Sequence, residues 1–165
     1  MTSLVLCKGL ASNIYKISNI QSITKGLFVI MGVNAINVTD FNADVIAEND
    51  NLILGTSTWG AGEVQDDWYD GINAIQAADL SGKTVAIFGC GDSASYSDTF
   101  CGGMAVIYNA VKAAGANVVG AVDASKYTYD DSEAVVNGQF VGLALDNDNE
   151  DDKTDSRIES WIAAI

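Results

Sequence analysis

The chain has 165 residues, of which 48% are apolar and 18% charged, so it suits a single globular domain over residues 1–165 and is not intrinsically disordered. Its net charge of −14 argues against binding to nucleic acid or to an anionic membrane surface. It contains no histidine, which removes the usual zinc sites and the Ser–His and Cys–His nucleophiles of many hydrolases.

The charge is unevenly distributed, and the first residues do not show the pattern of a signal peptide. No acidic residue precedes Asp40, whereas the chain from Asp40 onward holds 22 acidic and five basic side chains, a balance of −17. The first residues lack the basic start and cleavage site of a signal peptide, and no apolar run reaches the length of a membrane span, about 18 residues. We therefore expect a soluble, cytoplasmic protein whose three cysteines are reduced.

Apolar runs and helical periodicities alternate along the chain. Strands are predicted at residues 3–7, 33–38, 52–54, 83–88 and 117–120, with a further strand piece at 140–145. Isoleucines recur near helical spacing from Ile14 to Ile23, and helices are predicted at 66–77, 103–114 and 156–165. This alternation predicts an α/β fold, a doubly wound parallel sheet with helices on both faces.

The segment DNLILGTSTWGAGEVQDDW (50–68) combines a buried strand, Leu52–Leu54, with residues suited to a flat ligand. We expect Gly55 to open a loop of hydroxyl residues that presents Trp59 between flexible glycines. Asp66 and Asp67 are predicted in the first turn of the next helix, where carboxylates are favoured by the helix dipole. This segment alone has two interpretations: it forms a site for a planar ring, or Trp59 is an ordinary interface tryptophan.

A second loop, GCGDSASYSDTF (89–100), follows the strand at 83–88 and brings Tyr96 beside two carboxylates. In open parallel sheets, ligands bind beyond the carboxyl ends of the strands. The loops at 8–13, 56–62 and 89–99 are therefore expected to share one edge of the sheet. Aromatic side chains from the last two loops can hold a flat ring between their faces.

Three motifs together resemble those of long-chain flavodoxins: TSTWGAGEVQDDW (56–68), SGKTVAIFGCGDSASYSDTFCGGM (81–104) and VVNGQFVGLALDNDNEDDKTDSRIESWI (135–162). The likeness extends from about Val33 to the C-terminus. It implies a five-stranded parallel sheet in the order 2-1-3-4-5, for which flavodoxins are a standard example, with FMN bound where the strand order reverses. It also implies that residues 123–139 are the insertion that interrupts the fifth strand of long-chain members.

The resemblance assigns roles to the ring-binding residues. Trp59 matches the inner aromatic that stacks on the flavin, and Tyr96 matches the outer one. Gly60–Ala61 matches the peptide that turns over on one-electron reduction, a role that suits glycine because a positive φ costs it little. Asp92 and Asp98 match positions near the ring, where negative charge lowers the second reduction potential; loop capping is the alternative for both.

The remaining contacts follow the same resemblance. Residues 56–58 match the loop whose hydroxyls and amides meet the phosphate and ribityl chain. The complete cofactor-binding set that the resemblance implies is Gly9, Leu10, Ala11, Ser12, Asn13, Ile14, Thr56, Ser57, Thr58, Trp59, Gly60, Ala61, Gly62, Cys90, Gly91, Asp92, Tyr96, Asp98, Thr99, Phe100 and Cys101.

The phosphate loop departs from the family pattern. Flavodoxins place (Thr/Ser)-x-Thr-Gly-x-Thr after the first strand, where this chain has Gly9–Ile14, and three of the expected hydroxyls are missing. Backbone amides still bind phosphate, but several lost hydrogen bonds of about 1 kcal/mol each weaken FMN binding by orders of magnitude. Three explanations stay open: a changed phosphate site, a protein that has lost its flavin, and an N-terminus whose recorded sequence is altered.

The sequence thus predicts a low-potential one-electron carrier that uses FMN and is not an enzyme. It is expected to act as a monomer with basic redox proteins, such as flavodoxin or ferredoxin reductases and oxidoreductases, and to use no metal. The alternative is a flavin-free or weakly flavin-binding interaction module on the same fold. A phosphorylated receiver domain is disfavoured, because Cys7-Lys8-Gly9 offers no acidic pair after the first strand.

Overall fold

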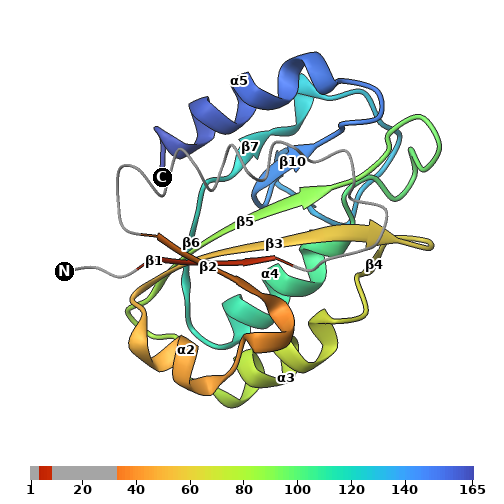
Figure 1. Cartoon of the computed structure of the whole chain (residues 1–165). Helices are drawn as coiled ribbons and strands as arrows, with labels where there is room; N and C mark the ends of the chain where they lie inside the picture. Colours follow the sequence, from red (N-terminus) through yellow and green to blue (C-terminus); the bar gives the residue numbers. More distant parts are fainter. Residues whose placement is uncertain (1–3, 9–32) are drawn as a thin grey trace.

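The computed structural model describes the backbone of residues 4–8 and 33–165, arranged as Figure 1 shows. The predicted helical stretch Ile14–Ile23 and the phosphate-loop match Gly9–Ile14 lie outside these residues. Within the described part of the chain, no helix is both long and apolar enough to cross a membrane.

Strands and helices alternate along the described chain. The strands are β1 (Leu4–Lys8), β2 (Val33–Asn37), β3 (Asn51–Trp59), β4 (Glu63–Val64), β5 (Thr84–Cys90), β6 (Asn117–Val119), β7 (Val122–Asp123), β8 (Val135–Val136), β9 (Gln139–Phe140) and β10 (Leu143–Leu145). The helices are α2 (Ala43–Glu48), α3 (Trp68–Ala77), α4 (Gly103–Ala113) and α5 (Asp151–Ile162), with 3₁₀ turns η2 (Val38–Asp40) and η3 (Ala124–Lys126).

A parallel sheet with the strand path β10-β5-β3-β1-β2 forms the centre of the molecule. Two segments share the place beside β5: β6 pairs with its first half, with Val119 opposite Ala86, and β10 with its second half, with Leu143 opposite Phe88. The predicted strand piece at 140–145 is therefore two strands, β9 outside the central sheet and β10 within it. The expected α/β class with a central parallel sheet is confirmed.

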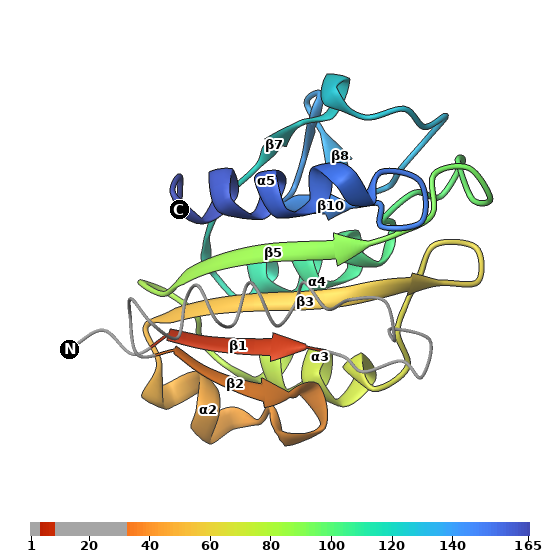
Figure 2. The same ribbon diagram turned by 45° about the horizontal axis from the view of Figure 1, so that its top comes forward.

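Helices cover both faces of this sheet, with α2, α3 and α4 on one side and α5 on the other (Figures 1 and 2). The continuous apolar run of β3 explains this arrangement, because alternate side chains of a strand point to opposite faces. Leu52 and Leu54 belong to the larger core cluster with Trp68 of α3, whereas Ile53 packs in a second cluster with Trp161 of α5.

Several predicted boundaries are wrong. Strand β3 does not stop at residue 54, because it continues through Trp59 in parallel pairing with β5 and antiparallel pairing with β4. Helix α3 begins at Trp68, so Asp66 and Asp67 lie in the preceding turn, where the Asp67 carboxylate accepts a hydrogen bond from the Gln65 side chain at 2.6 Å. Helix α5 begins at Asp151 rather than at residue 156, and α2 has no counterpart among the predicted elements.

The segment between β6 and β10 forms a small antiparallel sheet of its own, β7-β9-β8, which lies beside α5 in Figure 1. Its aromatic side chains pack on Phe100, whose ring lies 5.8 Å from that of Phe140 and 6.2 Å from that of Tyr127. The Arg157 guanidinium of α5 lies 4.2 Å above the Tyr127 ring, a cation–π contact. This segment, called the insertion below after its expected role, is thus an ordered unit that packs on the loop after β5 and on α5.

Candidate functional site

The carboxyl ends of β3 and β5 place the two predicted ring-binding loops side by side. The parallel register between these strands extends to Ser57 opposite Cys90, and both chains then leave the sheet at the same edge (Figure 2). The β3–β4 turn also touches the start of α4, since a Cβ on Gly102 would lie 3.1 Å from the Gly62 Cα. The structure therefore brings the segments 56–62 and 90–103 together.

A tight hairpin connects β3 and β4 and carries the predicted Gly60–Ala61 peptide. The Gly62 amide donates to the Trp59 carbonyl at 3.1 Å, and the two turn glycines have φ values of +51° (Gly60) and +102° (Gly62). Glycine adopts this left-handed backbone at little cost, whereas most other residues are strained there. The Ala61 amide donates to the Glu63 carboxylate at 2.6 Å, which holds the peptide at the tip of the turn.

The hydroxyl residues lie in β3 rather than in a loop, and two of their three hydroxyls make a hydrogen bond within the chain. The Thr56 hydroxyl donates to the Ser57 carbonyl at 2.8 Å, and the Thr58 hydroxyl accepts from the Gly103 amide at 3.3 Å. The hydroxyl oxygens of Ser57 and Thr99 are buried and have no hydrogen-bond partner in the described part of the chain. An unsatisfied buried hydroxyl costs about 1–3 kcal/mol, so these two sites suit polar ligand atoms.

Two aromatic side chains are exposed at this edge. Trp59, the last residue of β3, is 39% exposed, and Tyr96 of the second loop is 56% exposed. Single exposed aromatic side chains are common on protein surfaces, but two at one edge of the sheet suit a surface that another group covers. A planar, partly apolar molecule between them would bury both rings.

Two predicted site residues have side chains in the core. Phe100 is 1% exposed and packs within the aromatic cluster of the insertion, and Cys101 is fully buried. Their side chains therefore do not reach a ligand, which leaves only their backbone for contact. Burial raises the pKa of the Cys101 thiol well above its usual range and that of Cys90 to about 12, so both thiols stay protonated at neutral pH.

The two acidic residues of the second loop differ in role. Asp92 caps the loop, since its carboxylate accepts from the amides of Ala94 at 3.1 Å and Ser95 at 2.9 Å and from the Asn149 side chain at 2.9 Å. The Asn149 bond, helped by those from Ser95 and Ala94, lowers the pKa of Asp92 to about 2. The capping interpretation is thus confirmed for Asp92, which is also ionised at neutral pH, while Asp98 is exposed.

Sequence reasoning missed two residues of this edge, Glu63 and Asn149. The position of Glu63, two residues after the turn peptide that it binds, gives a local signal in the form of a carboxylate after Gly-x-Gly. Asn149 lies 57 residues from Asp92 in the chain, and no local pattern indicates that contact. No group of acidic or cysteine side chains in residues 4–8 and 33–165 is arranged to hold a metal ion.

Comparisons with known proteins agree with this geometry. The family model described as Flavodoxin matches residues 21–161, so the loop Gly9–Ile14 lies outside the match. Flavodoxin 1 of Azotobacter vinelandii is 47% identical over 124 residues, which cover 74% of this chain and 71% of that protein. A Nostoc flavodoxin is 40% identical over 133 residues, with 81% of this chain and 75% of that protein covered.

Solved structures lead to the same family. The crystal structure of Fusobacterium nucleatum flavodoxin bound to flavin mononucleotide superposes with a TM-score of 0.90 at 28% identity and covers 99% of this chain and 96% of that one. A mutant of the same Fusobacterium protein, also bound to flavin mononucleotide, gives a TM-score of 0.87 at 27% identity, with 99% and 95% covered. The family match over most of the chain, the close relatives and the parallel sheet together establish that this chain belongs to the flavodoxin family.

Proposed function

We propose that this chain is a low-potential one-electron carrier, not an enzyme, and that it holds FMN non-covalently between Trp59 and Tyr96. The observation that carries the proposal is the pair of exposed aromatic side chains at neighbouring strand ends in a member of the flavodoxin family. The FMN-bound Fusobacterium relative supports the same cofactor. Bound FMN would accept and release one electron at a time, while the protein tunes the potentials.

In this proposal the ring half of the site is formed by the hairpin and the second loop. Trp59 and Tyr96 cover the two faces of the ring, and the Gly60–Ala61 peptide lies at its edge. The positive φ of Gly60 and the bond from Ala61 to Glu63 hold that peptide in one defined orientation. Because glycine moves between backbone regions at little cost, the peptide is able to change orientation with the redox state.

Buried hydroxyls and amides supply the polar contacts of the proposed site. The unpartnered hydroxyls of Ser57 and Thr99 are available to ligand oxygens, and each bond formed there relieves an unsatisfied buried group. Asp92 brings a permanent negative charge to the same edge, because its pKa of about 2 keeps it ionised at neutral pH. A fixed negative charge disfavours further negative charge nearby, so it lowers the second reduction potential.

The phosphate half is the weaker part of the proposed site. The segment Gly9–Ile14 lacks three hydroxyls of the family pattern and lies outside the family-model match. We propose that the ring contacts dominate flavin affinity in this chain. The flavin-free interaction module is the less favoured alternative, because two exposed aromatic side chains at the strand ends would then serve no ligand.

The proposed partners are basic redox proteins, such as flavodoxin or ferredoxin reductases and oxidoreductases. The chain from Asp40 onward has a balance of −17, and Glu63, Asp66 and Asp98 are exposed on or beside the proposed flavin edge. Such a field accelerates association with a positively charged protein and weakens as salt is added. We further propose a monomeric, cytoplasmic, long-chain flavodoxin with one domain over residues 1–165, whose insertion covers the side of the second loop.

The test is a titration of the purified full chain with FMN and, separately, with riboflavin. We expect quenching of flavin fluorescence in both titrations, and a bound FMN whose second reduction potential lies below that of free FMN. Equal affinity for the two flavins would show that the phosphate half is inactive, whereas tighter FMN binding would show that it works. Flavin fluorescence that stays unquenched at saturating concentrations of both would refute the proposed function.

A further inference from the structure

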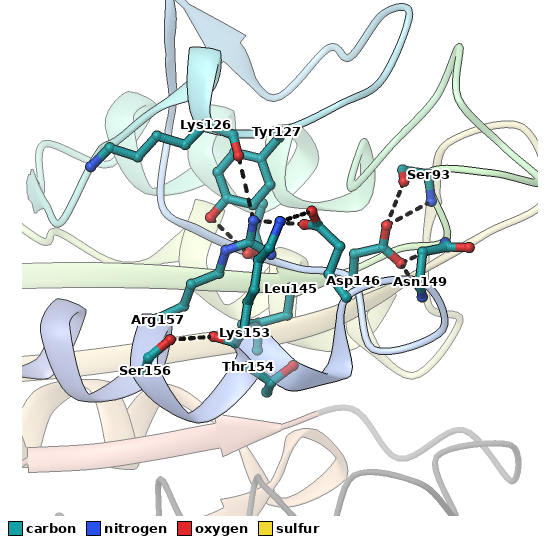
Figure 3. Close-up of polar contacts among 12 residues, drawn as sticks. Ser93, Lys126, Tyr127, Leu145, Asp146, Asn149, Lys153, Thr154, Ser156 and Arg157 are labelled. Atoms are coloured by element: carbon teal, nitrogen blue, oxygen red, sulfur yellow. Dashed lines mark hydrogen bonds and ion pairs between the residues drawn. The ribbon is translucent and has the colours of Figure 1, made fainter.

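The turn between β10 and α5 is bonded to the loop that carries Tyr96. Asp146 follows β10 directly and is only 1% exposed. One of its carboxylate oxygens accepts from the Ser93 amide at 3.3 Å and the Ser93 hydroxyl at 2.5 Å. The other accepts from the Asn149 side-chain amide at 2.8 Å (Figure 3). A buried carboxylate with this many donors is fixed in place.

Asn149 links this turn to a second carboxylate. Its side-chain nitrogen also donates to Asp92 at 2.9 Å, so the two N–H groups of one amide bridge Asp92 and Asp146. Asp92 in turn accepts from the amides of Ala94 and Ser95. The first turn of the loop is therefore held against the turn before α5 by the Ser93–Asp146 bonds and by one exposed side chain, Asn149.

The far side of the loop has its own anchor on the insertion. The Ser97 carbonyl accepts from the amides of Asp130 at 2.9 Å and Asp131 at 3.0 Å, and the Ser97 hydroxyl donates to the Asp130 carboxylate at 2.5 Å. Tyr96 lies between the two anchors, with its backbone amide bonded to the Asp92 carbonyl at 3.0 Å. Its backbone is thus tied on both sides while its ring stays exposed to meet a ligand.

We propose that Asn149 is a positioning residue for the flavin site: it holds Asp92 and Tyr96 where the ring binds. This inference rests on the proposed function, because it takes the exposed face of Tyr96 as a flavin contact. A loop fixed beforehand loses less conformational entropy on binding, which increases affinity. The Asn149 bridge also keeps two carboxylates in proximity by placing donor groups between them.

The test compares Asn149→Ala with Asn109→Ala, since Asn109 is an exposed asparagine of α4 away from this loop. For Asn149→Ala we expect the Kd for riboflavin to rise about tenfold, equivalent to about 1.4 kcal/mol. The Kd for FMN should rise by the same factor, because the phosphate is held elsewhere. Asn109→Ala should leave both values within twofold of the wild type, and an unchanged riboflavin Kd in Asn149→Ala would overturn the proposal.

A third variant separates position from charge. Asp92→Asn keeps the oxygen that accepts from Ala94 and Ser95, so the loop stays in place while its charge is lost. We expect this variant to raise the second reduction potential of bound flavin, because a fixed negative charge beside the ring is removed. A second reduction potential equal to that of the wild type would contradict the role given to the Asp92 charge.

Hydrogen exchange in the flavin-free protein tests the loop anchor independently of the cofactor. The amides of Ala94 and Ser95 should exchange about tenfold faster in Asn149→Ala than in the wild type, because loosening the bridge opens the turn. If the wild type bound no flavin, the proposed function would fail, and the exchange rates alone would decide whether Asn149 holds the loop. Unchanged exchange would overturn that role.

Discussion

Replacing Trp59 by alanine is the most direct probe of the ring half of the site. An aromatic side chain buries up to about 250 Å² when it is fully covered. The 39% of Trp59 that is exposed therefore amounts to about 100 Å². At about 25 cal/mol per Å², covering all of this surface with a flavin contributes about 2.5 kcal/mol, and covering half contributes about 1.2 kcal/mol.

From this we expect Trp59→Ala to raise the Kd for riboflavin about 8- to 70-fold. Riboflavin is the preferred ligand, because its binding does not depend on the phosphate loop. The assay is a fluorescence titration of flavin quenching, repeated by calorimetry. Far-UV circular dichroism verifies that the variant is folded, since the covered part of the indole also packs against the protein.

Tyr69→Ala provides the matched control. Tyr69 is 55% exposed on α3 and is not a predicted ring contact, so its removal should change the riboflavin Kd by less than twofold. A Trp59→Ala variant that binds riboflavin as tightly as the Tyr69→Ala variant would refute the stacking argument and, with it, the position proposed for the flavin ring.

Three other changes test the scaffold around the site. Gly60→Ala introduces a side chain at a residue with φ +51° and places it against the Glu63 carboxylate. The free energy of unfolding in urea should therefore fall by about 1–2 kcal/mol, and no loss of stability would contradict the left-handed turn. Trp68→Phe removes the buried hydrogen bond from the indole N–H to the Gly55 carbonyl (3.0 Å). It should lower the midpoint of thermal unfolding by at least about 2 °C, and an unchanged midpoint would contradict the importance of this bond. The low pKa of Asp92 stabilises the fold above pH 4, and this contribution is lost as the pH falls towards 2. Asp92→Asn should therefore reduce the difference in unfolding free energy between pH 7 and pH 2.5 by about 1 kcal/mol after solvent screening. An equal difference in both proteins would count against this role of Asp92.

The sequence predicts the layered α/β architecture because long apolar runs and helical periodicities depend on local spacing. Gly55 is a position where local spacing gives the wrong prediction. A glycine after a short apolar run indicates a loop, yet β3 continues through it because β5 pairs with it from Asn51 to Ser57. The Phe88 ring occupies the space that a side chain at residue 55 would need, and the Trp68 indole bonds to its carbonyl. These partners are distant in sequence, so no local pattern reveals them.

The candidate site likewise contains residues that local sequence predicts and residues that it does not. Trp59 and Tyr96 are recognisable in the sequence because aromatic residues among glycines and serines are unusual, and both are exposed in the structure. Phe100 is predicted from its place in the motif, but its ring packs in the core, since the aromatic partners of the insertion follow some 27 to 40 residues later in the chain. Asn149 escapes prediction because its role depends on how α5 meets the second loop.

The split fifth strand position brings the two ends of the insertion close together. Val119 of β6 and Leu143 of β10 pair with residues of β5 only two apart, so the chain leaves and re-enters the sheet at points about 7 Å from each other. Loop-closure entropy rises by only about 0.6 kcal/mol for each doubling of length between two such fixed ends. Chain closure therefore sets little limit on the length of a segment grafted between these junctions, and its main requirement is to cover Phe100 as the present aromatic side chains do.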